Sequence, residues 1–413
     1  ASASFIPTSA FPGIKSEYGI NYLKLRAGYG TSANFSTGYP TVTLVNLNTQ
    51  AWADDAGNLI TSNSTASSVG NLDIKPELFS EIEFGVEGKL FSRMNFDVSF
   101  YTRETQDLIV GSRPIPPSSG ASFSPSNIGK IEIEGLEVDL GLDILKSDTG
   151  VNWNFNWNFT KQRSEVTELD GDTQLIIYAG FTNLGNGARV GYPLGTIFGS
   201  RIARDESGNL LVDGVGNYVS ETIDEEGLLP AIGDPNPDWV MNYTNTISYK
   251  GLSLGVNVGH TSGGDIYSIT IASLMGRGLT TDTEDRLGTY ILPGVSAATG
   301  EPNDIQINNS DFYFSNGFAS PADELSVYDG SVVRLREVSL AYTLPAKFLE
   351  KTPIGRLTIK ASGFNMWYKA YNTPDGINFD PNVAGLGAGN GQGFDYLTGP
   401  SSKRYGVSIN ATF

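Results

Sequence analysis

Two pairs of glutamates have a spacing from which a hydrolytic site could be built. Glu81 and Glu83 are two positions apart, and so are Glu132 and Glu134. Neighbours on one face of a β-strand lie about 7 Å apart, and two carboxylates at such a separation can serve a glycosidase as acid and nucleophile. The alternative is that both pairs are polar residues of a barrel wall, and the strand pattern around them favours this second interpretation.

The composition excludes several other chemistries. The chain of 413 residues has no cysteine and a single histidine, His260, which excludes thiol catalysis, disulfides and Cys- or His-rich metal sites. A formal net charge of -18 argues against nucleic-acid binding, because phosphate recognition needs clustered Lys and Arg. We therefore expect no cofactor, no catalytic residue and no nucleic-acid partner.

Carboxylates are concentrated in segments between the predicted strands. Their oxygens could bind calcium, but none of them has the spacing of an EF-hand loop. A solvated acidic surface is the favoured interpretation, so we predict no metal site. The residues are Glu165, Glu168, Asp170, Asp172, Asp205, Glu206, Asp213, Asp224, Glu225 and Glu226.

The clearest strand pattern lies at residues 151–159, where large apolar side chains alternate with asparagine. A period of two places the apolar side chains on one face of a strand and the asparagines on the other. A soluble β-sandwich could use such a strand, with the aromatic side chains in its core. In a barrel, the asparagines would face the lumen; they are Asn152, Asn154, Asn156 and Asn158.

The same alternation recurs at residues 82–86, 94–100, 239–249, 252–258 and 405–413. No stretch approaches the roughly 18 apolar residues of a membrane helix, so a membrane could be crossed only by strands closed into a barrel. Apolar, aromatic-rich faces opposite faces of Gly, Asn, Ser and Thr are typical of a membrane barrel with a wet lumen. We predict an all-β, antiparallel transmembrane β-barrel. Phe413, at the end of an alternating segment, matches the signal by which outer-membrane barrels are assembled.

The connections between these strands alternate in length. Short ones lie at 89–93, 143–150 and 250–251, and long ones at 31–76, 105–129, 261–330 and 369–403. Outer-membrane barrels have short periplasmic turns and long extracellular loops, so the long set is predicted to be external and Phe413 periplasmic. Residues 164–238 then form one external excursion with short strands of its own, including a hairpin at Ser207, Gly208 and Asn209. About ten spanning strands remain.

One predicted strand changes phase. Its apolar residues occupy odd positions through Ile133 and even positions from Leu136 onward. A β-bulge at Glu134 and Gly135 would explain the change, and two short strands joined by a kink would explain it equally well.

Other loop residues have more than one interpretation. Pro114, Pro116 and Pro117 predict a stiff loop, with contact to a partner as the alternative. Aromatic side chains near the last strands could stack on sugars or form an interface girdle. They are Trp367, Tyr368, Tyr371, Phe394 and Tyr396.

Several segments, in order, resemble the C-terminal half of the SusC/RagA family of TonB-linked outer-membrane proteins. The resemblance covers essentially all of residues 1–413, and the ordered set is specific although each motif is weak. The motifs are NYLKLRAGYG at 21–30, DIKPE at 73–77, NIGKIE at 127–132, GLE at 135–137, GDPNPDW at 233–239, DGS at 329–331, RLREVSLAYTLP at 334–345 and RYGV at 404–407.

The resemblance implies a barrel of roughly 22 strands closed by an N-terminal plug, of which residues 1–413 would be the C-terminal portion. An open sheet in lipid would leave unpaired backbone groups at several kcal/mol each, so the remaining strands and the plug are expected outside this chain, which shows no signal-peptide pattern at its start. The family implies import of an oligosaccharide or oligopeptide across the cell outer membrane, coupling to the TonB complex through the missing part, and a SusD-like surface lipoprotein as lid. A barrel enzyme and a soluble carbohydrate-binding or adhesin module are the alternatives.

Overall fold

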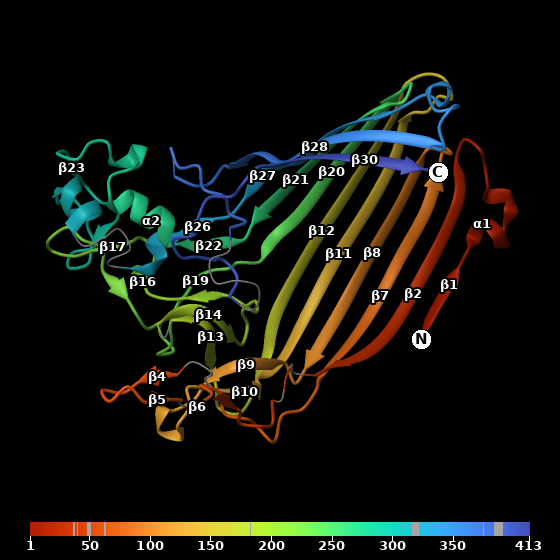
Figure 1. Ribbon diagram of the computed structural model, residues 1–413. Helices are drawn as coiled ribbons and strands as arrows, with labels where there is room; N and C mark the ends of the chain where they lie inside the picture. The colour runs from red at the N-terminus through yellow and green to blue at the C-terminus, as the bar shows by residue number, and fades with distance from the viewer. Residues whose placement is uncertain are drawn as a thin grey trace.

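The computed structural model describes residues 1–413 apart from 36, 37, 39, 48–50, 62, 182, 316–321, 375 and 384–390, together with the side chains of residues 112, 117 and 315. One large antiparallel sheet dominates it, and an assembly of loops covers one end of that sheet (Figure 1). The strand order is β1-β2-β7-β8-β11-β12-β20-β21-β27-β28-β30. Every neighbour in this order is antiparallel, as predicted.

Ten of the eleven strands are long, which agrees with the predicted number of spanning strands. The exception is β1 (Ser2–Phe5), which pairs with the start of the sheet and precedes a single turn of helix, α1 (Pro7–Ala10). The long strands are β2 (Ile20–Asn34), β7 (Glu77–Leu90), β8 (Met94–Gln106), β11 (Gly129–Leu145), β12 (Asn152–Leu169), β20 (Pro237–Tyr249), β21 (Leu252–Gly263), β27 (Val332–Thr343), β28 (Arg356–Ala370) and β30 (Arg404–Thr412).

Short turns close one end of the sheet. Residues 91–93, 146–151 and 250–251 join consecutive strands there, and a longer connection at 344–355 does the same. The two-residue turn needs left-handed backbone at both Lys250 (φ 46°) and Gly251 (φ 83°), which favours glycine at the second position. Thr412 pairs with Arg356, the first residue of β28, so Phe413 lies at this same end.

The alternation of residue types along the strands separates the sheet into an apolar and a polar face. In the β11–β12 pair, Leu140 lies opposite Trp157 and Asp139 opposite Asn158. The register between β12 and β20 continues the pattern, with Trp157 opposite Tyr243 and Asn156 opposite Thr244. Because each strand presents large apolar side chains to the same side, one whole face of the sheet is apolar.

The predicted bulge at Glu134 and Gly135 is wrong. Pairing of β11 with both neighbours runs without a register shift through these residues. Ile131 and Ile133 therefore lie on the polar face. Ile131 is buried, and its partner Val166 packs in a core cluster with residues of the loop assembly, so the loops cover the polar face at this end of the sheet. Apolar residues of β11 thus lie on one face near the loop assembly and on the other face farther along the strand, because the loops cover the polar face at the first end only.

The long connections fold into the loop assembly. The predicted excursion is shorter than expected, because β12 continues to Leu169, and residues 170–236 contain small strands outside the main sheet. The predicted hairpin is present: Arg204 and Leu210 form an antiparallel bridge across a turn in which the Asp205 carboxylate accepts from the amides of Ser207 and Asn209. Tyr192 to Ile202 lies within this excursion and does not cross the main sheet.

Seven small strands of the excursion pair with one another or with other loops. They are β13 (Leu175–Phe181), β14 (Leu184–Arg189), β15 (Ile197–Phe198), β16 (Arg201–Ile202), β17 (Leu211–Val212), β18 (Ser220–Glu221) and β19 (Ala231–Gly233). Other loop strands are β3 (Val45–Leu47), β4 (Trp52–Ala53), β5 (Leu59–Ile60), β6 (Asn63–Thr65), β9 (Ile109–Pro114), β10 (Phe123–Asn127), β22 (Asp265–Ser268), β23 (Thr289–Tyr290), β24 (Val295–Ser296), β25 (Ile307–Asn308), β26 (Val327–Asp329) and β29 (Phe394–Asp395).

The longest helix, α2 (Ile269–Gly276), belongs to the loop assembly. Ser268 caps its N-terminus, because its hydroxyl accepts from the Ile271 amide (3.1 Å). The same hydroxyl donates to the buried carboxylate of Asp395 (2.5 Å), which ties α2 to β29 across 127 residues of sequence. In the part of the chain that the structure describes, no helix is long and apolar enough to cross a membrane.

Candidate functional site

The polar face of the sheet carries a network of ion pairs at β2, β7 and β8. Arg26 donates to Glu83 (3.0 Å) and, through both Nη atoms, to Asp97 (2.7 Å each). Gly85 lies opposite Arg26, and a Cβ added there would collide with the guanidinium. The glycine therefore leaves the space in which Arg26 lies flat across the strands and reaches two carboxylates.

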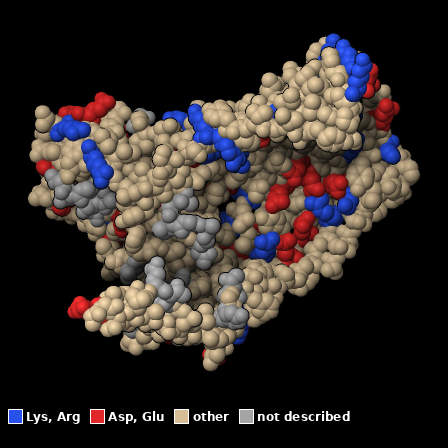
Figure 2. Space-filling model, in the orientation of Figure 1, with Lys and Arg blue, Asp and Glu red and all other residues tan. Residues whose placement is uncertain are grey.

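Two further pairs extend this network along the strands. Lys24 donates to Glu87 (3.2 Å), and Arg103 donates to Glu81 (2.7 Å). Figure 2 shows acidic and basic side chains gathered in the hollow of the molecule, whereas most of the surrounding surface is neither. Glu81 and Glu83 thus each bind a cation, an arrangement that suits wall residues and not a free acid and nucleophile.

The four predicted asparagines lie on this polar face, but their roles differ. Asn154 donates to Asp143 (3.1 Å), Asn156 donates to Asn154 (2.6 Å) and Asn158 donates to Asp139. Asn152 instead closes the turn between β11 and β12, where its side chain exchanges hydrogen bonds with the backbone of Ser147 (2.8 and 2.9 Å). Three asparagines therefore present polar groups to the hollow, and the first one stabilises a turn.

Near the other edge of the sheet, an arginine on the polar face binds a loop. Arg334 on β27 donates to Asn365 (2.6 Å) and pairs through both Nη atoms with Asp380, from the connection between β28 and β30. Both partners are nearly buried. Burial tends to raise the pKa of Asp380, but the interactions with Arg334, Ser401 and the Asn382 amide together outweigh it, so the pKa lies below its usual value.

A bulge beside Arg334 directs a second arginine to the same face. The register between β21 and β27 slips by one residue at Arg336, because Asn257 pairs with Glu337 and Val258 with Leu335. Arg336 lies over Gly259, where a Cβ would collide with its guanidinium. Glu337 accepts from Lys360 (2.8 Å) on the next strand.

Charge is therefore distributed unevenly across the polar face. The strands β7, β8 and β11 contribute mostly carboxylates, the central strands β12, β20 and β21 contribute mainly Asn, Thr, Ser and Gly, and the last strands contribute mostly cations. The acidic set is Glu81, Glu83, Glu87, Asp97, Glu137, Asp139 and Asp143, and the basic set is Arg334, Arg336, Lys360 and Arg404.

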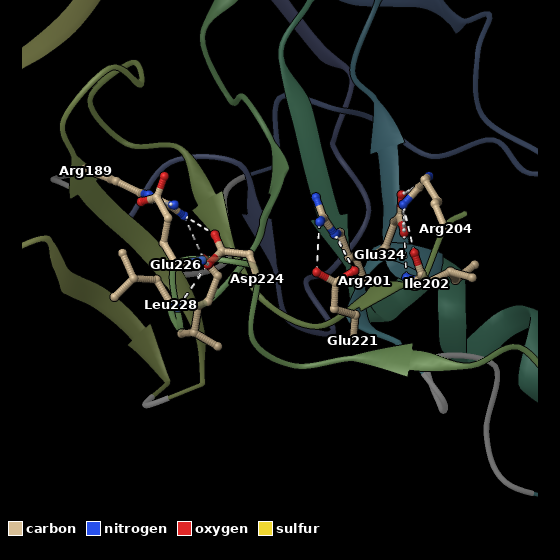
Figure 3. A network of polar contacts seen from close by, with 10 residues as sticks. Arg189, Arg201, Ile202, Arg204, Glu221, Asp224, Glu226, Leu228 and Glu324 are labelled. Carbon is tan, nitrogen blue, oxygen red and sulfur yellow. Dashed lines mark hydrogen bonds and ion pairs between the residues drawn. The ribbon is translucent and has the colours of Figure 1, made fainter. Parts of the chain in front are cut away.

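Ion pairs also fix the loop assembly above the hollow. Figure 3 shows Arg189 between Asp224 (2.6 Å) and Glu226 (2.8 Å), and Arg201 paired with Glu221 through two hydrogen bonds (2.8 and 3.0 Å). Burial tends to raise the pKa of Asp224, yet the Leu228 amide and Arg189 lower it below the usual value. The acidic turn at 224–228 is thus a structural anchor of the loop.

The second glutamate pair, the possible metal ligands and Phe394 lie away from the polar network. Glu132 and Glu134 lie on the face opposite to Glu81 and Glu83, so they do not line the hollow. No group of His, Asp or Glu side chains able to hold a metal ion is found among the residues described. Phe394 is buried against Tyr267.

The other aromatic residues and prolines have varied surroundings. Tyr371 accepts or donates a hydrogen bond with His260 (3.1 Å), Tyr396 packs against Phe181, and Arg334 lies over the ring of Tyr368. Trp367 is half exposed on the apolar face of β28. Pro114 ends β9, and Pro116 follows it in the same connection.

Comparison with known proteins identifies the family. A family model described as "TonB dependent receptor-like, beta-barrel" matches residues 18–290, more than half of the chain. The chain belongs to this family. The receptor barrel is accordingly an outer-membrane protein, in a family of receptors and transporters and not of enzymes.

Relatives and solved structures agree with this assignment. TonB-dependent receptors P3 and P26 of Formosa agariphila are 26% and 25% identical to this chain, which we call the receptor barrel. The alignments cover 97% and 95% of the receptor barrel and 40% of each relative. The RagAB peptide importer in its closed-closed state superposes with a TM-score of 0.67 at 21% identity, covering 100% of the receptor barrel and 43% of that chain. The SusC/RagA resemblance is thereby confirmed in fold, and the receptor barrel spans less than half the length of these proteins.

Residues that sequence reasoning missed are the charged members of the polar face. Lys24, Arg26 and Asp97 alternate with apolar residues in predicted strands, so their parity alone could have placed them opposite the apolar face. Nothing local pairs Arg334 with Asp380, which lie 46 residues apart.

Proposed function

We propose that the receptor barrel is the C-terminal wall of an outer-membrane importer for bulky nutrients, either oligosaccharides or oligopeptides. The observation that carries this proposal is the curved sheet with its ten long strands, which has an apolar face on one side and a charged, hydrogen-bonded face around a hollow on the other (Figures 1 and 2). Lipid solvates the first face and water the second. The end with short turns is periplasmic, and the loop assembly faces the exterior.

The proposal includes a larger closed barrel. The outer edge of β30 has no partner among the described strands, and every residue of β30 is exposed. An open edge in lipid leaves backbone donors and acceptors unsatisfied. Further strands and a plug domain, outside residues 1–413, complete a wall of roughly 22 strands, with Asn154, Asn156 and Asn158 facing its lumen. Phe413 serves as the assembly signal at the periplasmic end.

Two partners follow from the same proposal. The TonB complex supplies energy through the segment that contains the plug, and a SusD-like lipoprotein closes the loop assembly from outside. Leu59, Leu72 and Leu287 of the long connections are 76%, 83% and 97% exposed, which suits burial by such a lid. The family match to TonB-dependent receptors supports the first partner, and the structural likeness to the RagAB peptide importer supports the second.

Growth of a gene-deletion strain tests the proposal. The deletion strain and its complemented form are grown on panels of oligosaccharides or of oligopeptides as the sole carbon source, with the corresponding monomers as controls. We expect growth to fail on one polymer class and to persist on its monomers, with rescue by the full-length gene. Unchanged growth on both classes would contradict the proposal.

Cysteine labelling tests the orientation, because the receptor barrel has no cysteine of its own. Val215→Cys lies in the loop assembly, where the valine is 68% exposed, and Asp148→Cys lies in the turn between β11 and β12. A membrane-impermeant maleimide applied to intact cells is expected to label the first variant and to spare the second. The reverse labelling pattern would overturn the proposed orientation.

A further inference from the structure

Arg336 on β27 occupies a bulge that affects three strands. The register slips at this residue toward β21 and again toward β28, so Arg336 has no paired residue on either side. Opposite the second slip, Asn365 takes a left-handed backbone conformation (φ 54°). Bulges of this kind redirect a side chain, and here the redirected side chain is a guanidinium on the polar face.

The neighbouring strand leaves room for this guanidinium. Gly259 of β21 lies beneath it, and a Cβ at that position would collide with Nε of Arg336. Asn158, Asn242 and Gly259 form one row across the polar face, because each pairs with the next. Arg336 is exposed, and the row that leads away from it across the wall offers amide groups.

The charge of Arg336 is not neutralised by the wall. Arg334, two residues earlier, pairs with Asp380. Lys360, on the next strand, pairs with Glu337. In contrast, no carboxylate oxygen of the described residues lies within 4.0 Å of Arg336, and none of these residues forms a hydrogen bond with its guanidinium. Both neighbouring carboxylates are therefore occupied, and the guanidinium of Arg336 is available to an anion that is not part of this wall.

Arg336 lies where a solute that enters the hollow would pass. Val332, at the loop end of β27, pairs with Ala370, the last residue of β28. Arg334 binds Asp380 of the connection between β28 and β30. Arg336 is therefore just inside the hollow, beneath the loop assembly. It is also on the face that water covers, so the anion that reaches it comes from the lumen and not from lipid.

We propose that Arg336 binds a carboxylate of the oligomer that the receptor barrel imports, so that its substrates are acidic. A guanidinium holds a carboxylate through two parallel hydrogen bonds. The amides of Asn158 and Asn242 can form hydrogen bonds with the uncharged part of the same oligomer. The carboxylate belongs either to the sugar acids of an oligosaccharide or to the acidic residues of an oligopeptide. This inference rests on the proposed import function and names the chemical class of its substrate.

Binding to the full-length protein in detergent micelles tests the site with two matched pairs of probes. One pair is a galacturonate oligomer and its methyl ester, and the other is a glutamate-containing oligopeptide and its glutamine counterpart. Wild type is expected to bind the acidic member of one pair about tenfold more tightly than the neutral member, because a hydrogen bond to a charged group contributes about this much. The pair that shows the preference identifies the source of the carboxylate. Arg336→Gln should remove the preference, and Arg336→Lys should retain part of it.

Two further variants separate binding from general effects of charge. Lys89→Gln removes an exposed cation from the polar face at the short-turn end of β7, and it should leave the preference intact. Gly259→Ala keeps every charge but displaces the guanidinium of Arg336. It should therefore weaken the preference in the wild-type background and have no further effect in Arg336→Gln. Heat-dependent gel mobility verifies that each variant is folded.

The possible failures of this inference and of the import proposal are distinguishable. A wild type without preference for the acidic member of either pair would overturn the carboxylate site. The same preference in folded Arg336→Gln, with a lower thermal stability, would overturn it as well and assign Arg336 to a carboxylate elsewhere in the full-length protein. If the deletion strain fails on one polymer class while Arg336→Gln restores growth on its acidic and neutral forms alike, import stands and the carboxylate site falls. Unchanged growth of the deletion strain on both classes would overturn both.

Discussion

Large apolar side chains are exposed on the wall, which is the main sheet of long strands, but buried in the loop assembly. On the apolar face of the wall, Phe84, Val407 and Ile409 are 57%, 75% and 67% exposed, whereas Ile197, Phe198 and Phe394 of the loop assembly are at most 2% exposed. A water-exposed sheet with such a surface would aggregate. The difference shows that the wall relies on lipid to cover its apolar side chains, and that the loops rely on one another.

Ion pairs are likewise more exposed on the wall than in the loop assembly. The side chains of Arg26, Glu83 and Asp97 on the wall are 26%, 38% and 34% exposed. In the loop assembly, Arg189 and Asp224 are 7% and 13% exposed. Water in the hollow therefore screens the wall pairs, and the loop pair is closer to a protein interior.

The largest effect is expected from opening the core of the loop assembly. Phe198→Ala removes a fully buried ring and should destabilise the assembly by about 3–5 kcal/mol. Hydrogen exchange of residues 184–233 would report the loss. Leu287→Ala, at a side chain that is 97% exposed, is the matched control and should leave exchange unchanged. Equal effects of both substitutions would contradict a packed core.

The two faces of a single wall strand should respond differently to charge. Phe155→Arg puts a cation on the lipid side of β12 and should cost about 2–4 kcal/mol near the middle of the bilayer. Asn156→Arg puts the same side chain on the polar face and should cost much less. Urea unfolding in lipid vesicles measures both. A larger cost for Asn156→Arg would reverse the assigned faces.

Removing one arginine from each region compares their ion pairs. Arg189→Met leaves Asp224 with two backbone amides, so we expect a loss of about 2 kcal/mol, below the ~3–5 kcal/mol of a fully buried pair. Arg26→Met should cost about 1 kcal/mol, because water reaches its carboxylate partners. Chemical denaturation at low and high salt distinguishes the two, and similar costs would remove the contrast between the regions.

The smallest effect concerns Asp265, at the start of β22. Its burial, and then the carboxylates of Asp329, Asp234 and Asp238, raise its pKa above the usual value. The protonated form is favoured in the folded state, so the stability it contributes is complete below the unfolded pKa of about 3.9 and is lost as the pH rises through the folded pKa. Asp265→Asn should abolish this loss and make the loop assembly more stable at pH 7. Thermal unfolding between pH 4 and 7 measures it; a parallel pH profile in wild type and variant would contradict the assignment.

Much of the wall follows from local pattern. A period of two in the strands and alternating connection lengths predict ten long antiparallel strands, their apolar sides and the end that carries the loops, because side-chain direction in a strand depends only on position. The polar side of Asn154, Asn156 and Asn158 follows in the same way. The alternation does not predict the side of Ile131 and Ile133. Here the strand enters the loop assembly, and protein instead of water covers its polar face.

The amino-acid sequence by itself determined which side of each strand is apolar and where the chain turns, since both are properties of neighbouring residues. Only the tertiary structure decided which charges meet. Arg26 reaches Asp97 across 71 residues, Arg334 reaches Asp380 across 46, and Arg189 reaches Asp224 across 35. These contacts depend on strand register and loop packing, and no local spacing encodes them. The side taken by Glu132 and Glu134 was also decided by the structure, because the register of β11 continues without a bulge through Gly135 and so places both on the face of Leu136, opposite to that of Glu81 and Glu83.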